Sequence, residues 1–78
     1  MPTVLRIGNY RFHFYSNEKN EPPHIHVRLD NFECKFWLNP ISLAKNNGIP
    51  AYKLHDIEKI IFENQSFFME KYNDFHAC

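Results

Sequence analysis

The fold can be predicted outward from one segment, His24-Ile25-His26-Val27-Arg28-Leu29-Asp30-Asn31-Phe32-Glu33-Cys34-Lys35-Phe36-Trp37-Leu38. Apolar and polar side chains alternate with a period of two on both sides of Asp30-Asn31, which predicts two half-buried strands. Asp and Asn tolerate a positive φ, so this pair predicts a two-residue hairpin turn. The turn fixes the register, beginning with Leu29 opposite Phe32, and the stretch therefore predicts a β-hairpin.

A second hairpin is predicted upstream. Residues 3–7 and 10–15 are rich in apolar and aromatic side chains and flank the turn signal Gly8-Asn9. In this register Arg6 faces Arg11. Residues 17–23 form a polar loop that ends in two prolines, which cannot continue a sheet ladder. The first half of the chain therefore predicts a four-stranded, mainly antiparallel sheet built from two hairpins.

The second half predicts helix. Residues 39–49 are a connection, and Pro50 suits a first helical turn, where its missing N–H costs nothing. Apolar residues then follow three- and four-residue spacing, as in an amphipathic helix. They are Leu54, Ile57, Ile60, Ile61, Phe67, Phe68, Tyr72 and Phe75. Asn64-Gln65-Ser66 favours a break, so residues 50–76 are either one long helix or two short ones packed on one face of the sheet. The fold class is α+β, with residues 1–78 as one domain.

Composition narrows the class of protein. The 78 residues carry 9 Lys and Arg against 9 Asp and Glu, so a generally basic surface is excluded as the source of function. Apolar residues make up 44% of the chain, enough for a core. No apolar run reaches the roughly 20 residues that a membrane helix needs, so no membrane association is expected. The start turns polar at once, and Cys34 and Cys78 are no disulfide framework, so we expect a cytoplasmic protein.

Alternation divides the predicted sheet into two faces. The core face carries Leu5, Ile7, Tyr10, Phe12, Phe14, Ile25, Val27, Leu29, Phe32, Cys34, Phe36 and Leu38. The opposite face carries Arg6, Arg11, His13, Tyr15, His24, His26, Arg28, Glu33, Lys35 and Trp37. We expect the imidazole and guanidinium groups of this second face to point into solvent. A chain of zero net charge would then present a cationic sheet face.

Such a face is typical of single-stranded nucleic-acid binding. Arg6, Arg11 and Lys35 would contact phosphates, while Tyr15 and Trp37 would stack on bases. Two other interpretations stay open. The face could be an ordinary solvated surface with a cross-strand Arg28–Glu33 pair, or it could bind a protein, because Trp, Tyr and Arg are enriched at interfaces.

The pair His24 and His26 places two imidazoles about 7 Å apart on one strand. They could act as general acid and base in metal-independent RNA cleavage, with Arg28 stabilising the charge that builds on the phosphate. They could instead form half of a metal site. Its further ligands would come from His13, Glu33, Glu21 and Glu18. A purely structural role is the third interpretation.

The chain resembles a bacterial family catalogued as domain of unknown function 4160. The resemblance rests on Met1-Pro2-Thr3, the strand Tyr10–Ser16, Glu21-Pro22-Pro23-His24-Ile25-His26-Val27, Lys35-Phe36-Trp37-Leu38 and the closing helix. Its most specific element is Pro-Pro-His-x-His. Two positions depart from the pattern: Asn20 stands where members often have His, and Lys71-Tyr72 where they often have Asn-Trp. The missing histidine weakens a three-histidine metal site.

The resemblance implies small two-gene cassettes of the toxin–antitoxin type, and hence a small cognate protein partner. Our hypothesis is a toxin–antitoxin-type protein that binds RNA, or cleaves it without metal or cofactor. The alternatives are a non-enzymatic antitoxin or adaptor that pairs with a neighbour-encoded protein, and a metal-dependent hydrolase. Exposed edges of a small sheet also favour homo-oligomers.

Overall fold

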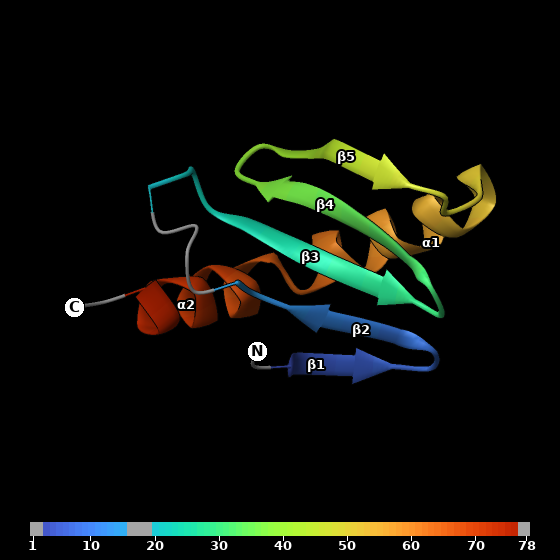
Figure 1. The fold of residues 1–78 in the computed structure, drawn as a ribbon. Coiled ribbons are helices and arrows are strands. Elements are labelled where there is room, and N and C mark those ends of the chain that lie inside the picture. Colours follow the sequence, from blue (N-terminus) through green and yellow to red (C-terminus); the bar gives the residue numbers. More distant parts are fainter. Residues whose placement is uncertain (1–2, 16–19, 77–78) are drawn as a thin grey trace.

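The structure is a computed structural model that describes residues 3–15 and 20–76. Five strands form one antiparallel sheet in the order β1-β2-β3-β4-β5. Two consecutive helices pack against one face of this sheet (Figure 1). The elements are β1 (Thr3–Ile7), β2 (Tyr10–His13), β3 (His24–Leu29), β4 (Phe32–Leu38), β5 (Ile41–Asn47), α1 (Ala51–Glu63) and α2 (Gln65–His76). The predicted α+β class is confirmed.

The central hairpin has the predicted register. All six pairs of β3 and β4 agree, from Leu29 opposite Phe32 to His24 opposite Trp37. Asp30 has a φ of 55°, which is the left-handed conformation that the turn requires. The first hairpin agrees up to Leu5 opposite Phe12. Beyond that point a bulge in β1 shifts the pairing by one residue, so His13 faces Thr3 rather than Val4.

The prediction of four strands was wrong, because part of the predicted connection 39–49 forms β5. Asn39-Pro40 turns the chain, and β5 then pairs with β4 along its length. Most of its side chains are exposed, as the 45% exposure of Leu43 illustrates. An edge strand held mainly by backbone hydrogen bonds needs no alternation of apolar and polar residues, so the sequence carried little signal for it.

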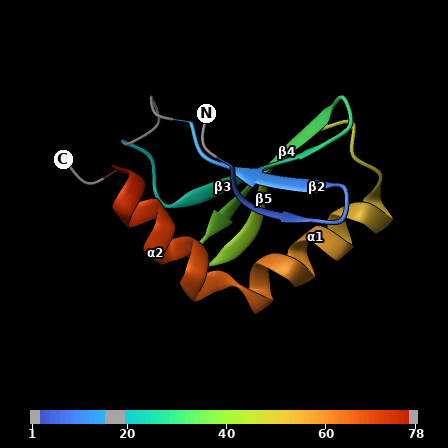
Figure 2. The ribbon, with the colours of Figure 1, turned by 90° about the horizontal axis from the view of Figure 1, so that it is seen from below.

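The predicted single C-terminal helix is two helices, as the break signal allowed. Asn64 ends α1: its backbone N–H donates to the carbonyl groups of Ile60 and Ile61, and its side-chain amide donates to Ile60 at 2.8 Å. The carbonyl oxygen of Asn64 then accepts from the N–H of Phe68 in α2. Figure 2 shows the two helices meeting at an angle beneath the sheet, so each covers a different part of it.

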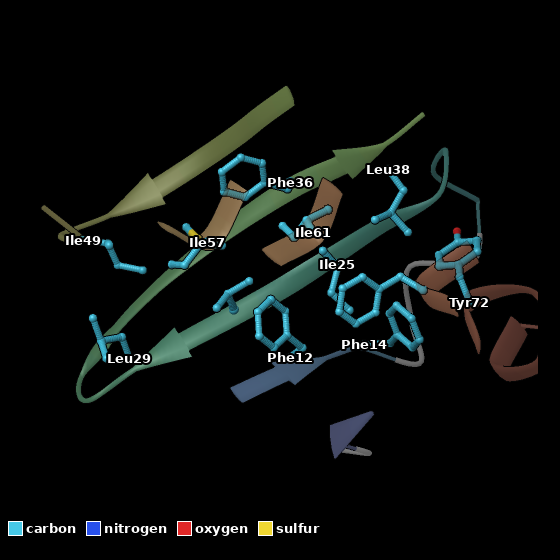
Figure 3. Packing of buried hydrophobic residues seen from close by; sticks show 13 residues of the cluster. Phe12, Phe14, Ile25, Leu29, Phe36, Leu38, Ile49, Ile57, Ile61 and Tyr72 are labelled. Atoms are coloured by element: carbon cyan, nitrogen blue, oxygen red, sulfur yellow. The ribbon is translucent and has the colours of Figure 1, made fainter. Parts of the chain in front are cut away.

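The core lies between the sheet and these helices (Figure 3). It consists of Phe12, Phe14, Ile25, Val27, Leu29, Cys34, Phe36, Leu38, Ile49, Ile57, Ile61, Phe68 and Tyr72. The predicted core face of the sheet and the predicted apolar face of the helices are therefore largely confirmed. Ile7, Phe32 and Phe67 are exceptions, with 38%, 45% and 37% of their surface exposed. Ile7 and Phe32 adjoin the hairpin turns.

Contacts with α2 and β4 hold the residues that lead into β3. The Tyr72 hydroxyl donates to the carbonyl oxygen of Glu21 at 2.9 Å. The N–H of Leu38 donates to the carbonyl oxygen of Pro23 at 3.0 Å. The start of α2 is held in turn, because the Gln65 side-chain amide donates to the carbonyl oxygen of Leu38. Residues 17–19 of the predicted polar loop, and residue 16 before it, lie outside the described residues.

Candidate functional site

The predicted polar residues of the strands lie on the sheet face opposite the helices, in rows that cross the strands, although His24 at the start of β3 also contacts Tyr72 of α2. We call this sheet face the polar face. One row runs through Arg6, Arg11 and Arg28 and continues to Glu33. The next row runs from His13 through His26 to Lys35. Register therefore brings the predicted site residues together, but they divide into two parts with different properties.

The first part is a closed cluster around the histidines. His13 and His24 have no exposed surface and His26 has 6%. The prediction that these imidazoles point into solvent was wrong, although they do lie on the polar face. Neighbouring rings cover them: His13 and His26 stack at 5.6 Å between ring centroids, and the Tyr15 ring packs edge-on against His26 at 4.4 Å.

Glu33 is the centre of this cluster. The Tyr15 hydroxyl lies 2.9 Å from both of its carboxylate oxygens and donates to them. Nδ1 of His26 lies 3.2 Å from one oxygen, and Nε2 of His13 lies 3.9 Å from the other. Glu33 and Arg28 are register partners, as predicted, but no described contact pairs their charges. Sequence analysis named Glu33 both as the partner of Arg28 and as a possible metal ligand beside the histidines, and in the structure its carboxylate lies beside His26 and His13.

His13 is a fully buried titratable group of the cluster, and its pKa is shifted. Burial lowers its pKa, and this outweighs the opposing effect of the nearby Glu33 carboxylate; the neighbouring His26 lowers it further. Neither of its ring nitrogens has a hydrogen-bond partner among the described residues. A neutral, buried imidazole of this kind is a poor ligand for a phosphate, which requires the charged form.

Lys35, Trp37 and His24 close the cluster at the end nearest Pro23. The Lys35 ammonium pairs with the Glu21 carboxylate and lies 4.7 Å from the centroid of the Trp37 ring. The edge of the His24 ring faces Trp37 at 5.9 Å, and Nδ1 of His24 donates to the carbonyl oxygen of Pro22 at 2.9 Å. Lys35, Trp37 and Tyr15 are therefore already engaged within the protein, unlike the free contacts and stacking surfaces that the sequence predicted.

The histidines do not assemble a metal centre in the part of the chain that the structure describes. No group of three or more His, Cys, Asp or Glu is arranged there to hold an ion. His13, His24 and His26 were the candidate ligands, with carboxylates as supplements. Glu18, one of those supplements, lies outside the described residues.

The second part of the polar face is the arginine row, Arg6, Arg11 and Arg28. These side chains line a cavity of about 270 Å³ together with Gly8, Asn9 and Asp30. Arg6 and Arg28 are exposed and Arg11 is half-buried. No described carboxylate forms an ion pair with any of the three. Like charges opposite one another across strands repel, so the row is an electrostatically open site for an anion.

Sequence reasoning assigned Asp30 and Asn9 only to turns. The pairing of β2 with β3 brings the two turns to the same end of the sheet, because Arg11 lies opposite Arg28, and no hairpin turn in the sequence determines that pairing. Figure 1 shows the β1–β2 and β3–β4 turns at that end.

In a comparison with protein families, residues 9–73 match the family described as a domain of unknown function, DUF4160. The chain belongs to the DUF4160 family. The matched region contains the Pro-Pro-His-x-His element and four of the five strands, from β2 to β5. Comparison with curated proteins and with solved structures gives no match. No helix within residues 3–15 and 20–76 is long and apolar enough to cross a membrane.

The description of the DUF4160 family names no activity, and the polar face is the part of this chain that bears on function. In this member of the family, the Pro-Pro-His-x-His histidines are 0% and 6% exposed and pack against Tyr72, Trp37 and Tyr15. Their contacts join α2, β3 and β4. The described geometry thus supports an architectural role for the motif.

Proposed function

We propose that the protein binds single-stranded RNA through the arginine row. The observation that carries the proposal is the set of three register-adjacent arginines that line one cavity and have no described counter-ion. Guanidinium groups bind phosphate oxygens in a bidentate manner, and neighbouring strands space them about 5 Å apart. A phosphate chain laid across β1, β2 and β3 would relieve the repulsion among the three cations.

The proposal is binding rather than cleavage. A general acid or base must come within hydrogen-bond reach of the proton that it transfers. The His24 and His26 side chains are almost fully covered by neighbouring rings, which keeps a sugar or phosphate away from them. Arg28 remains in the proposal as a phosphate contact.

The test is fluorescence anisotropy with a labelled single-stranded RNA at rising salt. Three phosphate contacts predict a slope of log K against log salt of about −2, and Arg11→Gln should flatten it by about 0.7. Lys59→Gln is the matched control, because it removes one exposed cation from α1, which packs on the other face of the sheet. Absence of RNA binding at low salt, or equal weakening by both variants, would overturn the proposal.

A second candidate is a protein-interaction module, as an antitoxin or adaptor that pairs with a neighbour-encoded protein. The observation that favours it is Phe62 on α1, whose surface is 73% exposed beside His55 and Lys59 in a shallow hollow. Apolar interfaces respond weakly to salt, whereas phosphate binding weakens steeply. Phe62→Ser should abolish co-purification of a co-expressed cassette partner if this candidate is correct, and should leave RNA binding unchanged.

A further inference from the structure

One acidic residue lines the arginine cavity. Asp30, in the β3–β4 turn, lines the cavity together with the three arginines. Its carboxylate forms no ion pair with them, nor with any other cation in the described ranges 3–15 and 20–76. A carboxylate repels a phosphate. A ligand that fills the whole cavity must therefore place its anion against the arginines and hydrogen-bond donors against Asp30.

Strand pairing brings Asp30 near the arginine row. Register pairs Arg11 with Arg28, and the turns that contain Asn9 and Asp30 follow at the same end of the sheet. Gly8 and Asp30 both have positive φ, at 58° and 55°, which is typical of tight turns, and both residues line the cavity. The Asn9 amide adds one donor group and one acceptor at this end.

We infer that the cavity prefers a guanine nucleotide unit of the RNA, with the phosphate on the arginine row and the base edge on Asp30. This inference rests on the proposed RNA binding and adds the identity of the base. Guanine presents two adjacent donors on its Watson–Crick edge, N1–H and the N2 amino group, which match the two oxygens of one carboxylate. Adenine and cytosine present a single amino group there, and uracil a single N–H.

The size of the cavity agrees with one nucleotide. Its volume of about 270 Å³ lies just below the roughly 300–1,000 Å³ that is typical of ligand sites. A cavity of this volume is too small for a base-paired helix. Recognition of Watson–Crick edges also requires unpaired bases. The ligand class is therefore a single-stranded RNA with an unpaired guanosine.

The experiment compares short single-stranded RNAs that are identical except for one central nucleotide: guanosine, inosine or adenosine. Inosine keeps N1–H and lacks the N2 amino group, so it isolates one of the two donors. The wild-type protein should bind the guanosine RNA about tenfold more tightly than the adenosine RNA, with inosine between them. Affinity is read by anisotropy in a buffer of fixed salt.

Asp30→Asn provides the decisive variant. Asn tolerates the same positive φ, so the turn is retained, while one acceptor oxygen becomes a donor amide. The variant should bind the guanosine and adenosine RNAs equally. Asp74→Asn, which removes an exposed carboxylate from α2, is the matched control and should keep the preference for guanosine.

Each outcome bears on a different claim. Failure of all three RNAs to bind overturns RNA binding and the base preference together. Equal binding of all three by the wild-type protein leaves RNA binding in place and overturns the guanine inference alone. A preference for guanosine that survives in Asp30→Asn also overturns it, because the discrimination then comes from another residue.

Discussion

The hydroxyl of Tyr15 lies 2.9 Å from both carboxylate oxygens of Glu33 and donates to the carboxylate from a position 18 residues away in sequence. This contact has a consequence across the sheet. Glu33 is the register partner of Arg28, yet its charge is directed toward Tyr15 and the histidines. Arg28 thus keeps a net positive charge toward the cavity that it lines.

Removal of this hydroxyl should affect both stability and binding. Tyr15→Phe removes a hydrogen bond to a charged group, and we expect a loss of about 1.5 kcal/mol in the free energy of unfolding. Glu33 should then become free to pair with Arg28, which should weaken RNA binding. Urea unfolding and anisotropy measure the two effects. Tyr52→Phe is the control, because Tyr52 is 68% exposed; equal effects of both variants would contradict the role given to Tyr15.

The pKa of His13 predicts loss of stability in mild acid. Burial lowers this pKa below its ordinary value of about 6.5. Between the two pKa values, the unfolded chain therefore binds a proton at His13 that the folded protein does not bind. The stability of the wild-type protein should therefore fall as pH decreases through about 6.5, and this contribution should level off below the folded pKa. Midpoints of urea unfolding between about pH 5.5 and 7.5 follow the effect.

His13→Phe should make this pH dependence shallower. The variant keeps an aromatic ring beside His26 and removes two buried nitrogens that have no described hydrogen-bond partner. Replacement of unsatisfied polar atoms should leave stability at neutral pH unchanged or slightly higher. His55→Gln, on the exposed surface of α1, should retain the full slope. An unchanged slope in His13→Phe would show that other groups account for the acid sensitivity.

Burial of Cys34 predicts an inert thiol. Only 2% of its surface is exposed, and burial, followed by the nearby Glu33 charge, raises its pKa to about 12. The thiolate is the reactive form, so Cys34 should resist a thiol reagent at neutral pH in the folded protein and react on unfolding. The measurement uses a Cys78→Ser background, which leaves Cys34 as the single cysteine. Rapid labelling of the folded protein would contradict this burial.

Much of the fold follows from local rules that the sequence displays. Asp30-Asn31 sets a two-residue turn, and one fixed turn determines every pair of β3 and β4. The positions of Ile57, Ile61, Phe68 and Tyr72 follow from helical spacing in the same manner. These features depend on residues close in sequence.

The remaining features depend on distant contacts. Alternation assigns His26 to the polar face but does not determine what covers it; the cover comes from Tyr15, from His13 of β2 and from His24 of the same strand. The arginine cavity likewise arises where two turns from separate hairpins meet. Zero net charge gave no indication of it, because a sum over the chain hides the local separation of charge.

Repulsion within the arginine row should lower the stability of the sheet. Arg11 lies between Arg6 and Arg28 in register, and like charges directly opposite one another destabilise a sheet by about 0.2–1 kcal/mol per pair. Arg11→Gln should therefore unfold at a slightly higher temperature than the wild-type protein at low salt. Inorganic phosphate should stabilise the wild-type protein by occupying the row, and it should stabilise the variant less.

Differential scanning calorimetry at matched ionic strength, with chloride in place of phosphate as the reference, separates this effect from general screening. Lys59→Gln should respond to phosphate as the wild-type protein does, because its cation lies on α1. An equal phosphate response in Arg11→Gln and wild type would mean that Arg11 does not bind phosphate, against the three phosphate contacts proposed for the row. The physical basis for RNA binding on the polar face would then be lost.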